Sequence, residues 1–142
     1  MRSLAHRFGA TTEEPRVERG PIRDLEAIAL ENAIEGCVRE TYGALQNAWQ
    51  AERATSARVR AAMRVIARDE LKHASFAWKI AAWIEPKLDA DARARVQEAR
   101  KDAAARLAAS IAVDDSLVDV CGLPSTSDAA ELVAGLRRAL WS

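Results

Sequence analysis

Glu70 and His73 are the residues whose types and spacing point most directly to chemistry. Side chains three residues apart on an α-helix lie one above the other on the same face, so this carboxylate and this imidazole can meet one ligand together. Carboxylate oxygens and neutral imidazole nitrogens are donors that iron and manganese accept in proteins. The same spacing also allows a purely structural hydrogen bond between the two side chains, and the pair alone does not separate these two interpretations.

The segment that must position this pair runs from residue 56 to residue 84. Eight positions at helical spacing form one stripe, and all but two of them are apolar: Val59, Met63, Ile66, Glu70, His73, Ala77, Ile80 and Ile84. This pattern predicts a helix that packs one face against other helices. Glu70 and His73 occupy the two polar positions of the stripe. A carboxylate buried there needs a partner, because an unpaired buried charge costs several kcal/mol or takes up a proton.

A first long helix is predicted from near residues 22–24 to about Arg53. Three acids interrupt its pattern. At ~100° per residue, Glu31 lies near the centre of the bulky face, Glu35 lies at its edge, and Glu40 lies almost opposite. The bulky face consists of Leu30, Ile34, Val38, Leu45 and Trp49.

The connection over residues 54–56 is short and predicts an antiparallel hairpin of the two helices. Counting back from this turn places about residue 40 beside Glu70 and His73 along the axis of the hairpin, which favours Glu40 as their partner. The side of the helix that faces the core instead favours Glu35 or Glu31. A stagger of a few residues, at ~1.5 Å each, would bring Glu35 to the pair. Turning Glu40 inward would turn the bulky face outward, and we therefore predict Glu35 as the third ligand. On Glu40's side, small residues at positions 36 and 43 could let another backbone come close.

The remaining chain is also predicted to be helical, which gives an all-α fold. Residues 1–21 are expected to form an arm or linker, and residues 22–142 a helical domain. The C-terminal part is expected to hold a helix from Asp89 or Asp91 to about residue 112, a short segment 117–121 ended by Gly122, and a last helix capped by Asp128 or Ser127.

Composition excludes some classes of function. Lys and Arg number 21 and Asp and Glu number 21, so net charge does not favour nucleic acid or an anionic membrane as a partner. No apolar run reaches the ~18–20 residues that span a bilayer. The first residues lack the apolar core of a signal peptide, and Cys37 and Cys121 show no CxxC spacing, so we expect a cytoplasmic protein with reduced thiols.

Two motifs carry a resemblance to a known family. Glu-Gly-Cys-Val-Arg-Glu-Thr occupies residues 35–41, and Asp-Glu-Leu-Lys-His-Ala occupies residues 69–74 and continues as Ser-Phe-Ala-Trp. Over roughly residues 25–84 the chain resembles the ferritin-like superfamily. More narrowly, it is similar to bacterial ferritin-like domain-containing proteins, in which an EGC-x-x-ET helix precedes a DE-x-x-HA-x-x-AW helix.

The resemblance implies a four-helix bundle that holds two iron or manganese ions and carries out oxidation with oxygen or peroxide. By resemblance, Glu35 is the ligand from the first helix, Glu70 bridges the metals and His73 is a terminal ligand. Such bundles use this half-site twice, whereas the sequence contains it once and matches the C-terminal half. A ferritin-like helical hairpin completed by a homodimer is therefore expected. The alternative is a metal-free structural module that mates with itself or with a partner helical chain.

Overall fold

The computed structural model describes residues 20–111 and 113–141, together with residues 6, 9, 11, 13, 14 and 16. Within this part every regular element is helical and no strand occurs, which confirms the all-α class. The arm expected over residues 1–21 lies largely outside the described residues. None of the described helices combines the length and apolar character needed to cross a bilayer.

The first helices form one continuous rod. α2 (Leu25–Glu31), η1 (Asn32–Glu40) and α3 (Thr41–Arg53) follow one another without a gap. Asp24 begins the rod as N-cap, its carboxylate accepting a 2.8 Å hydrogen bond from the Ala27 amide. The predicted limits of this helix are thus confirmed. The π-helical winding in the middle of the rod was not predicted: η1 is a π-helix, whose hydrogen bonds join residues i and i+5 and whose turns are wider than those of an α-helix.

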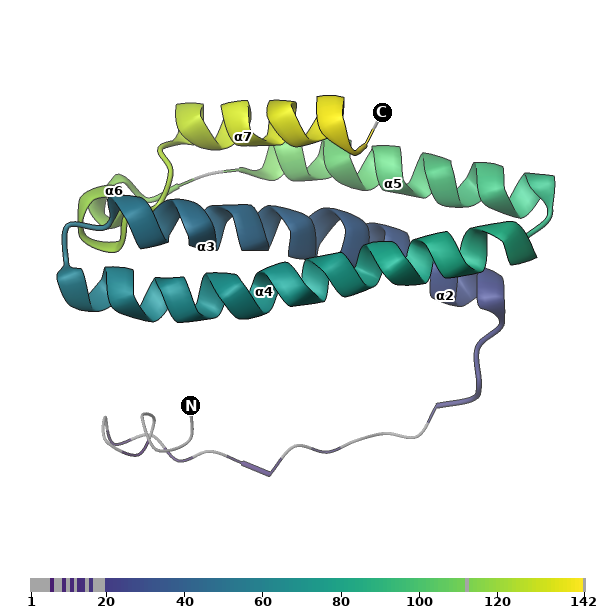
Figure 1. Ribbon diagram of the computed structural model, residues 1–142, viewed down its shortest axis with the longest axis horizontal. Coiled ribbons are helices and arrows are strands. Elements are labelled where there is room, and N and C mark those ends of the chain that lie inside the picture. Colours follow the sequence, from purple (N-terminus) through teal and green to yellow (C-terminus); the bar gives the residue numbers. More distant parts are fainter. Residues whose placement is uncertain are drawn as a thin grey trace.

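α4 (Ala57–Ile84) returns antiparallel to the rod (Figure 1). Ser56 is its N-cap and accepts a 3.4 Å hydrogen bond from the Val59 amide. Short 3₁₀-helix η2 (Glu85–Lys87) then leads to α5 (Ala90–Ser110).

The last two helices follow α5. Asp89 caps α5, one of the two residues predicted for that role. α6 (Asp115–Cys121) ends at Gly122, whose φ of 67° is the left-handed conformation that glycine favours. α7 (Thr126–Ala139) completes the fold.

The predicted cap of α7 was wrong. Neither Asp128 nor Ser127 is the N-cap, because the helix already begins after Ser125. The Ser125 hydroxyl accepts a 3.1 Å hydrogen bond from the Asp128 amide, and the Ser125 amide donates to the Asp128 carboxylate at 3.3 Å. Asp128 is therefore the third helical residue of a reciprocal capping box.

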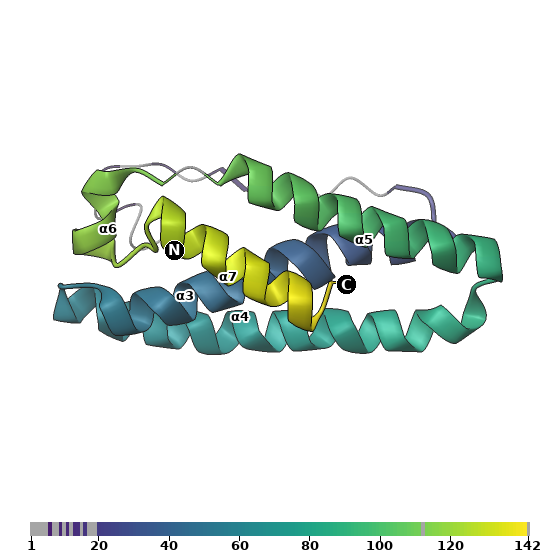
Figure 2. The same ribbon diagram turned by 90° about the horizontal axis from the view of Figure 1, so that it is seen from above.

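The rod has two buried faces. α5 and α7 cover one of them and α4 covers another (Figures 1 and 2). Bulky residues face α5 and α7: Val38 and Tyr42 form a core cluster with Ala103, Ala104, Val133 and Trp141. Small residues face α4, where Ala33 and Cys37 are fully buried and the Asn32 amide donates to the Ala77 carbonyl at 3.0 Å.

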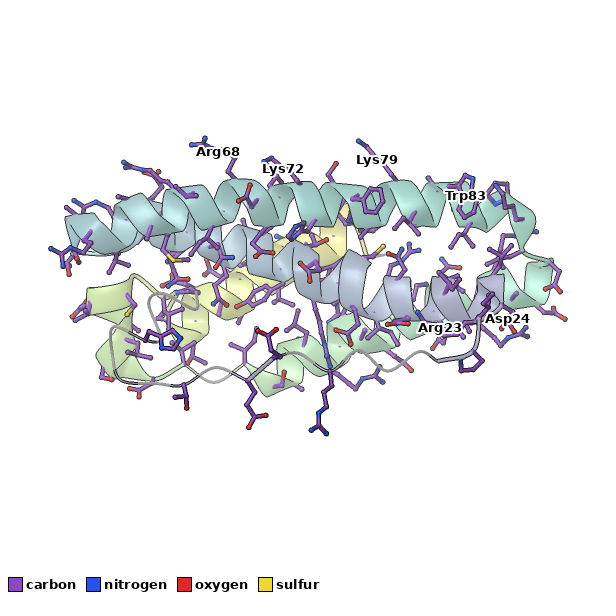
Figure 3. All side chains as sticks on the ribbon, turned by 90° about the horizontal axis from the view of Figure 1, so that it is seen from below. Arg23, Asp24, Arg68, Lys72, Lys79 and Trp83 are labelled. Atoms are coloured by element: carbon purple, nitrogen blue, oxygen red, sulfur yellow. The ribbon has the colours of Figure 1, made fainter. Side chains whose placement is uncertain are left out.

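α4 lies at the edge of the molecule. Arg68, Lys72 and Lys79 extend from its outer side, away from the rod (Figure 3). Apolar residues between this charged row and the rod are also exposed, including Phe76 at 64% and Trp83 at 57%. Among the described elements, no second helix covers this side of α4.

Candidate metal centre

Three potential ligands meet where the rod faces the middle of α4. Glu40 is the last residue of η1, whereas Glu70 and His73 project from α4. Each offers one ligand atom, and these three atoms all lie within 4.8 Å of one another. The Nδ1 atom of His73 is 3.3 Å from the Glu70 carboxylate. The structure thus brings Glu70 and His73 together, as their spacing predicted, and adds Glu40.

Glu35 lies outside this group. Its carboxylate accepts hydrogen bonds of 2.9 and 3.1 Å from Arg39, one helical turn further along, and the pair is exposed. Glu31, the other acid considered, forms an exposed ion pair with Arg23 near the start of the rod. The position that the sequence analysis gave to Glu35 is therefore taken by Glu40.

The packing of the rod explains this difference. The prediction of Glu35 required the bulky face of the first helix to meet α4, which would leave Glu40 outside. The bulky face instead meets α5 and α7, and the face of small residues meets α4. Gly36 allows the close approach, because a β-carbon there would lie 2.6 Å from the β-carbon of Ala77. Glu40 follows Gly36 by one turn and shares this face.

The π-helical winding contributes a second reason. A count of 100° per residue holds for an α-helix, but a wider turn rotates less per residue. Across η1 each side chain therefore lags behind its α-helical position, and Glu40, at the end of the segment, accumulates the largest lag. No periodicity of apolar residues signals this winding in advance.

The cluster opens to solvent on the side of α4 away from the core. Trp78 donates a 3.1 Å hydrogen bond to the Thr41 hydroxyl on the core side. His73, five residues earlier, lies ~140° around α4 from Trp78. The His73 side chain is 66% exposed and that of Glu70 is 30% exposed. One chain therefore covers the ligands on one side only.

Charge at the cluster favours a cation. Partial burial raises the pKa of the Glu40 carboxyl above its ordinary value of 4.5, and the hydrogen bond and negative charge of Glu70 raise it further. The charge of His73 lowers the pKa of the Glu40 carboxyl. Two carboxylates at this distance repel each other when both are ionised, and a proton or a bound cation relieves that repulsion.

Neighbouring polar and aromatic groups are engaged elsewhere. Asp69 pairs with Lys72 at 2.8 Å, which lowers the pKa of the Asp69 carboxyl. Tyr42 is buried in the core cluster with α5 and α7. Trp49 packs against Arg53, whose guanidinium carbon is 4.3 Å from its ring centre.

The donor set fits a divalent transition metal. Two carboxylates and one imidazole are ligands that suit iron and manganese, and three protein ligands leave coordination positions open. No protein-family model matches the chain, and neither a curated protein nor a solved structure matches it.

Proposed function

We propose that this chain is a ferritin-like carboxylate protein in which Glu40, Glu70 and His73 bind iron or manganese. The observation that carries the proposal is the meeting of three ligand atoms, from two helices, within 4.8 Å of one another. Both motifs of the resemblance still contribute: Glu40 is the second acid of EGC-x-x-ET, and DE-x-x-HA supplies Glu70 and His73.

A second copy of the chain completes the site in this proposal. One chain supplies two carboxylates and one imidazole, whereas a two-metal carboxylate bundle uses twice that number. Ile66 and Ile80 share the stripe of α4 with His73, and beside this stripe Phe76 is 64% exposed and Trp83 is 57% exposed. A two-fold interface that buries this stripe would bring two clusters face to face, because each subunit offers the same patch to the other.

The residues of the chain have separate tasks in this site. A pair of iron or manganese ions, when bound, supplies redox chemistry toward oxygen or peroxide. Glu40 and Glu70 hold the ions and neutralise their charge, and His73 binds as the neutral imidazole. Since these ligands bind metal only when deprotonated, metal affinity falls as pH is lowered.

The direct test is metal content together with native mass. Untagged protein is loaded with Fe(II) without oxygen, dialysed, and examined by elemental analysis and light scattering. We expect about one metal per chain in a dimer, as two half-sites would give. Glu40→Gln and His73→Ala should lose the metal, whereas Glu35→Gln should retain it. Wild-type protein that holds no metal after loading would overturn the proposal.

A metal-free interaction module is the second candidate. The exposure of the ligands and the His73–Glu70 contact at 3.3 Å favour it, since the two side chains already satisfy each other. In that case the double variant Glu70→Leu, His73→Ala would keep or raise the stability of the protein. The metal-binding protein would instead lose the stabilisation that added Fe(II) gives.

A further inference from the structure

A cavity of about 340 Å³ lies between the first part of the rod, the end of α4 and the first half of α5. Its volume falls in the range of small-molecule sites, roughly 300–1,000 Å³. Its wall is mixed: small or branched apolar side chains, among them Ala33, Ala81 and Ile84, share it with polar and charged side chains. None of its lining residues belongs to the cluster of Glu40, Glu70 and His73.

Arg100 contributes a cationic group to the wall of this cavity. Its Nε atom is buried and has no hydrogen-bond partner among the described residues. Its guanidinium carbon lies 5.2 Å from the ring centre of Trp78, so the planar group is held against an aromatic face. A buried N–H without an acceptor is costly, and a fixed guanidinium presents paired donors that match a carboxylate.

The other polar groups of the lining leave a net positive charge. Arg93 and Gln97 share the cavity side of α5 with Arg100, and Arg93 also donates to the Leu88 carbonyl at 2.5 Å. Glu85 is the acid of the lining, so two guanidinium groups and one carboxylate give it a net charge of +1. The cavity is thus suited to an anion with an apolar body.

We propose that this cavity binds a medium-chain carboxylate, its head group paired with Arg100 and its hydrocarbon tail along the alanine-rich wall. At about 30 Å³ for a water-sized group, the cavity holds on the order of ten non-hydrogen atoms, which corresponds to a carboxylate of about eight carbons. This inference is independent of metal binding, because it uses other residues, which lie at the C-terminal end of α4.

Calorimetric titration of the metal-free full-length protein with octanoate tests the proposal. Octanol keeps the tail without the charge, and acetate keeps the charge without the tail. We expect octanoate to bind and both analogues to bind at least about tenfold more weakly, since charge and apolar area both contribute. Octanoate should also shift the NMR signal of the Trp78 indole N–H. No octanoate binding, or equal binding of octanol, would overturn the proposal.

Variants locate the site. Arg100→Gln should weaken octanoate binding at least about tenfold, whereas Arg106→Gln, on the same helix outside the cavity, should leave it unchanged. Ala94→Leu fills the cavity from an exposed position of α5 and should also weaken binding. Unchanged affinity in folded Arg100→Gln protein would contradict the assignment, and the ligand series on wild-type protein remains decisive if that variant does not fold.

Discussion

Gly36 lies against Ala77 where the rod packs on α4: a β-carbon on Gly36 would stand 2.6 Å from the Ala77 β-carbon and 2.7 Å from the Asn32 side-chain oxygen. Glu40 follows Gly36 by one helical turn, and His73 precedes Ala77 by one turn. Because the two helices are antiparallel, the contact at Gly36 sets the distance between Glu40 and His73.

Gly36→Ala should destabilise the protein, because the added methyl group has no space against α4. We expect a loss of about 1–3 kcal/mol in the free energy of unfolding. Urea unfolding followed by circular dichroism measures it. Gly43→Ala is the matched control: nothing lies within 4 Å of its added carbon, so it should stabilise the helix by about 0.5–1 kcal/mol. Equal stability of the two variants would show that the helices do not approach closely at Gly36.

Glu40→Gln should affect the metal-free and metal-loaded protein in opposite directions. Because the pKa of Glu40 is raised in the fold, its ionised form is disfavoured there at neutral pH. Removing this charge should stabilise the metal-free protein slightly, by up to about 0.5 kcal/mol for so exposed a group. The increase in melting temperature that Fe(II) gives to wild-type protein should disappear. In Glu35→Gln protein that increase should persist, and its loss there would return Glu35 to the ligand set.

The pair of Glu26 and Arg95 should make stability depend on pH. Arg95 donates hydrogen bonds of 2.6 and 3.0 Å to the Glu26 carboxylate and joins α2 to α5. This hydrogen bond lowers the pKa of the Glu26 carboxyl below its ordinary value of 4.5. Because the pKa is lower in the folded protein, the pair stabilises the fold at pH values above the ordinary pKa of the carboxyl. This stabilisation is lost as the pH falls and the carboxylate takes up a proton.

Melting temperatures of wild-type and Arg95→Gln protein across pH check this expectation. The variant should melt below the wild type at about pH 7, and the difference should vanish near pH 2, where Glu26 is protonated in both. A difference that stays constant over this range would mean that Arg95 acts through packing instead of charge.

Trp141→Phe should weaken the attachment of the C-terminus to the rod. The Trp141 ring is 3% exposed, and its N–H donates a 2.8 Å hydrogen bond to the Cys37 carbonyl. Phenylalanine fills most of the space but leaves this carbonyl without its indole donor, so we expect a loss of about 1–3 kcal/mol in urea unfolding.

Local signals made most of the helices predictable. Ser56 and Asp89 cap helices because their short side chains reach amide groups three residues ahead, and this depends on neighbouring residues alone. The pairing of Glu70 with His73 was predictable for the same reason, since both lie on one α-helix.

The third member of the candidate site depended on contacts that are distant in the sequence. Which face of the rod meets α4 is decided by α5 and α7, which cover Val38 and Tyr42 more than 60 residues further along the chain. Once these bulky residues have another partner, Glu40 can face α4 without exposing them. The prediction also used a constant rotation of the helix per residue, and this does not hold across the π-helical turns of η1.

The wide turns of η1 also mean that the rod tolerates a change in residue number differently from a uniform α-helix. One codon gained or lost within residues 32–40 would swing α3 relative to α2 by ~100°, while both ends kept their own hydrogen-bonded turns. Such a change would exchange the carboxylate that faces α4 without replacing a single acidic residue. In this hairpin, the length of residues 32–40 therefore decides which carboxylate faces α4 as much as the residue types do.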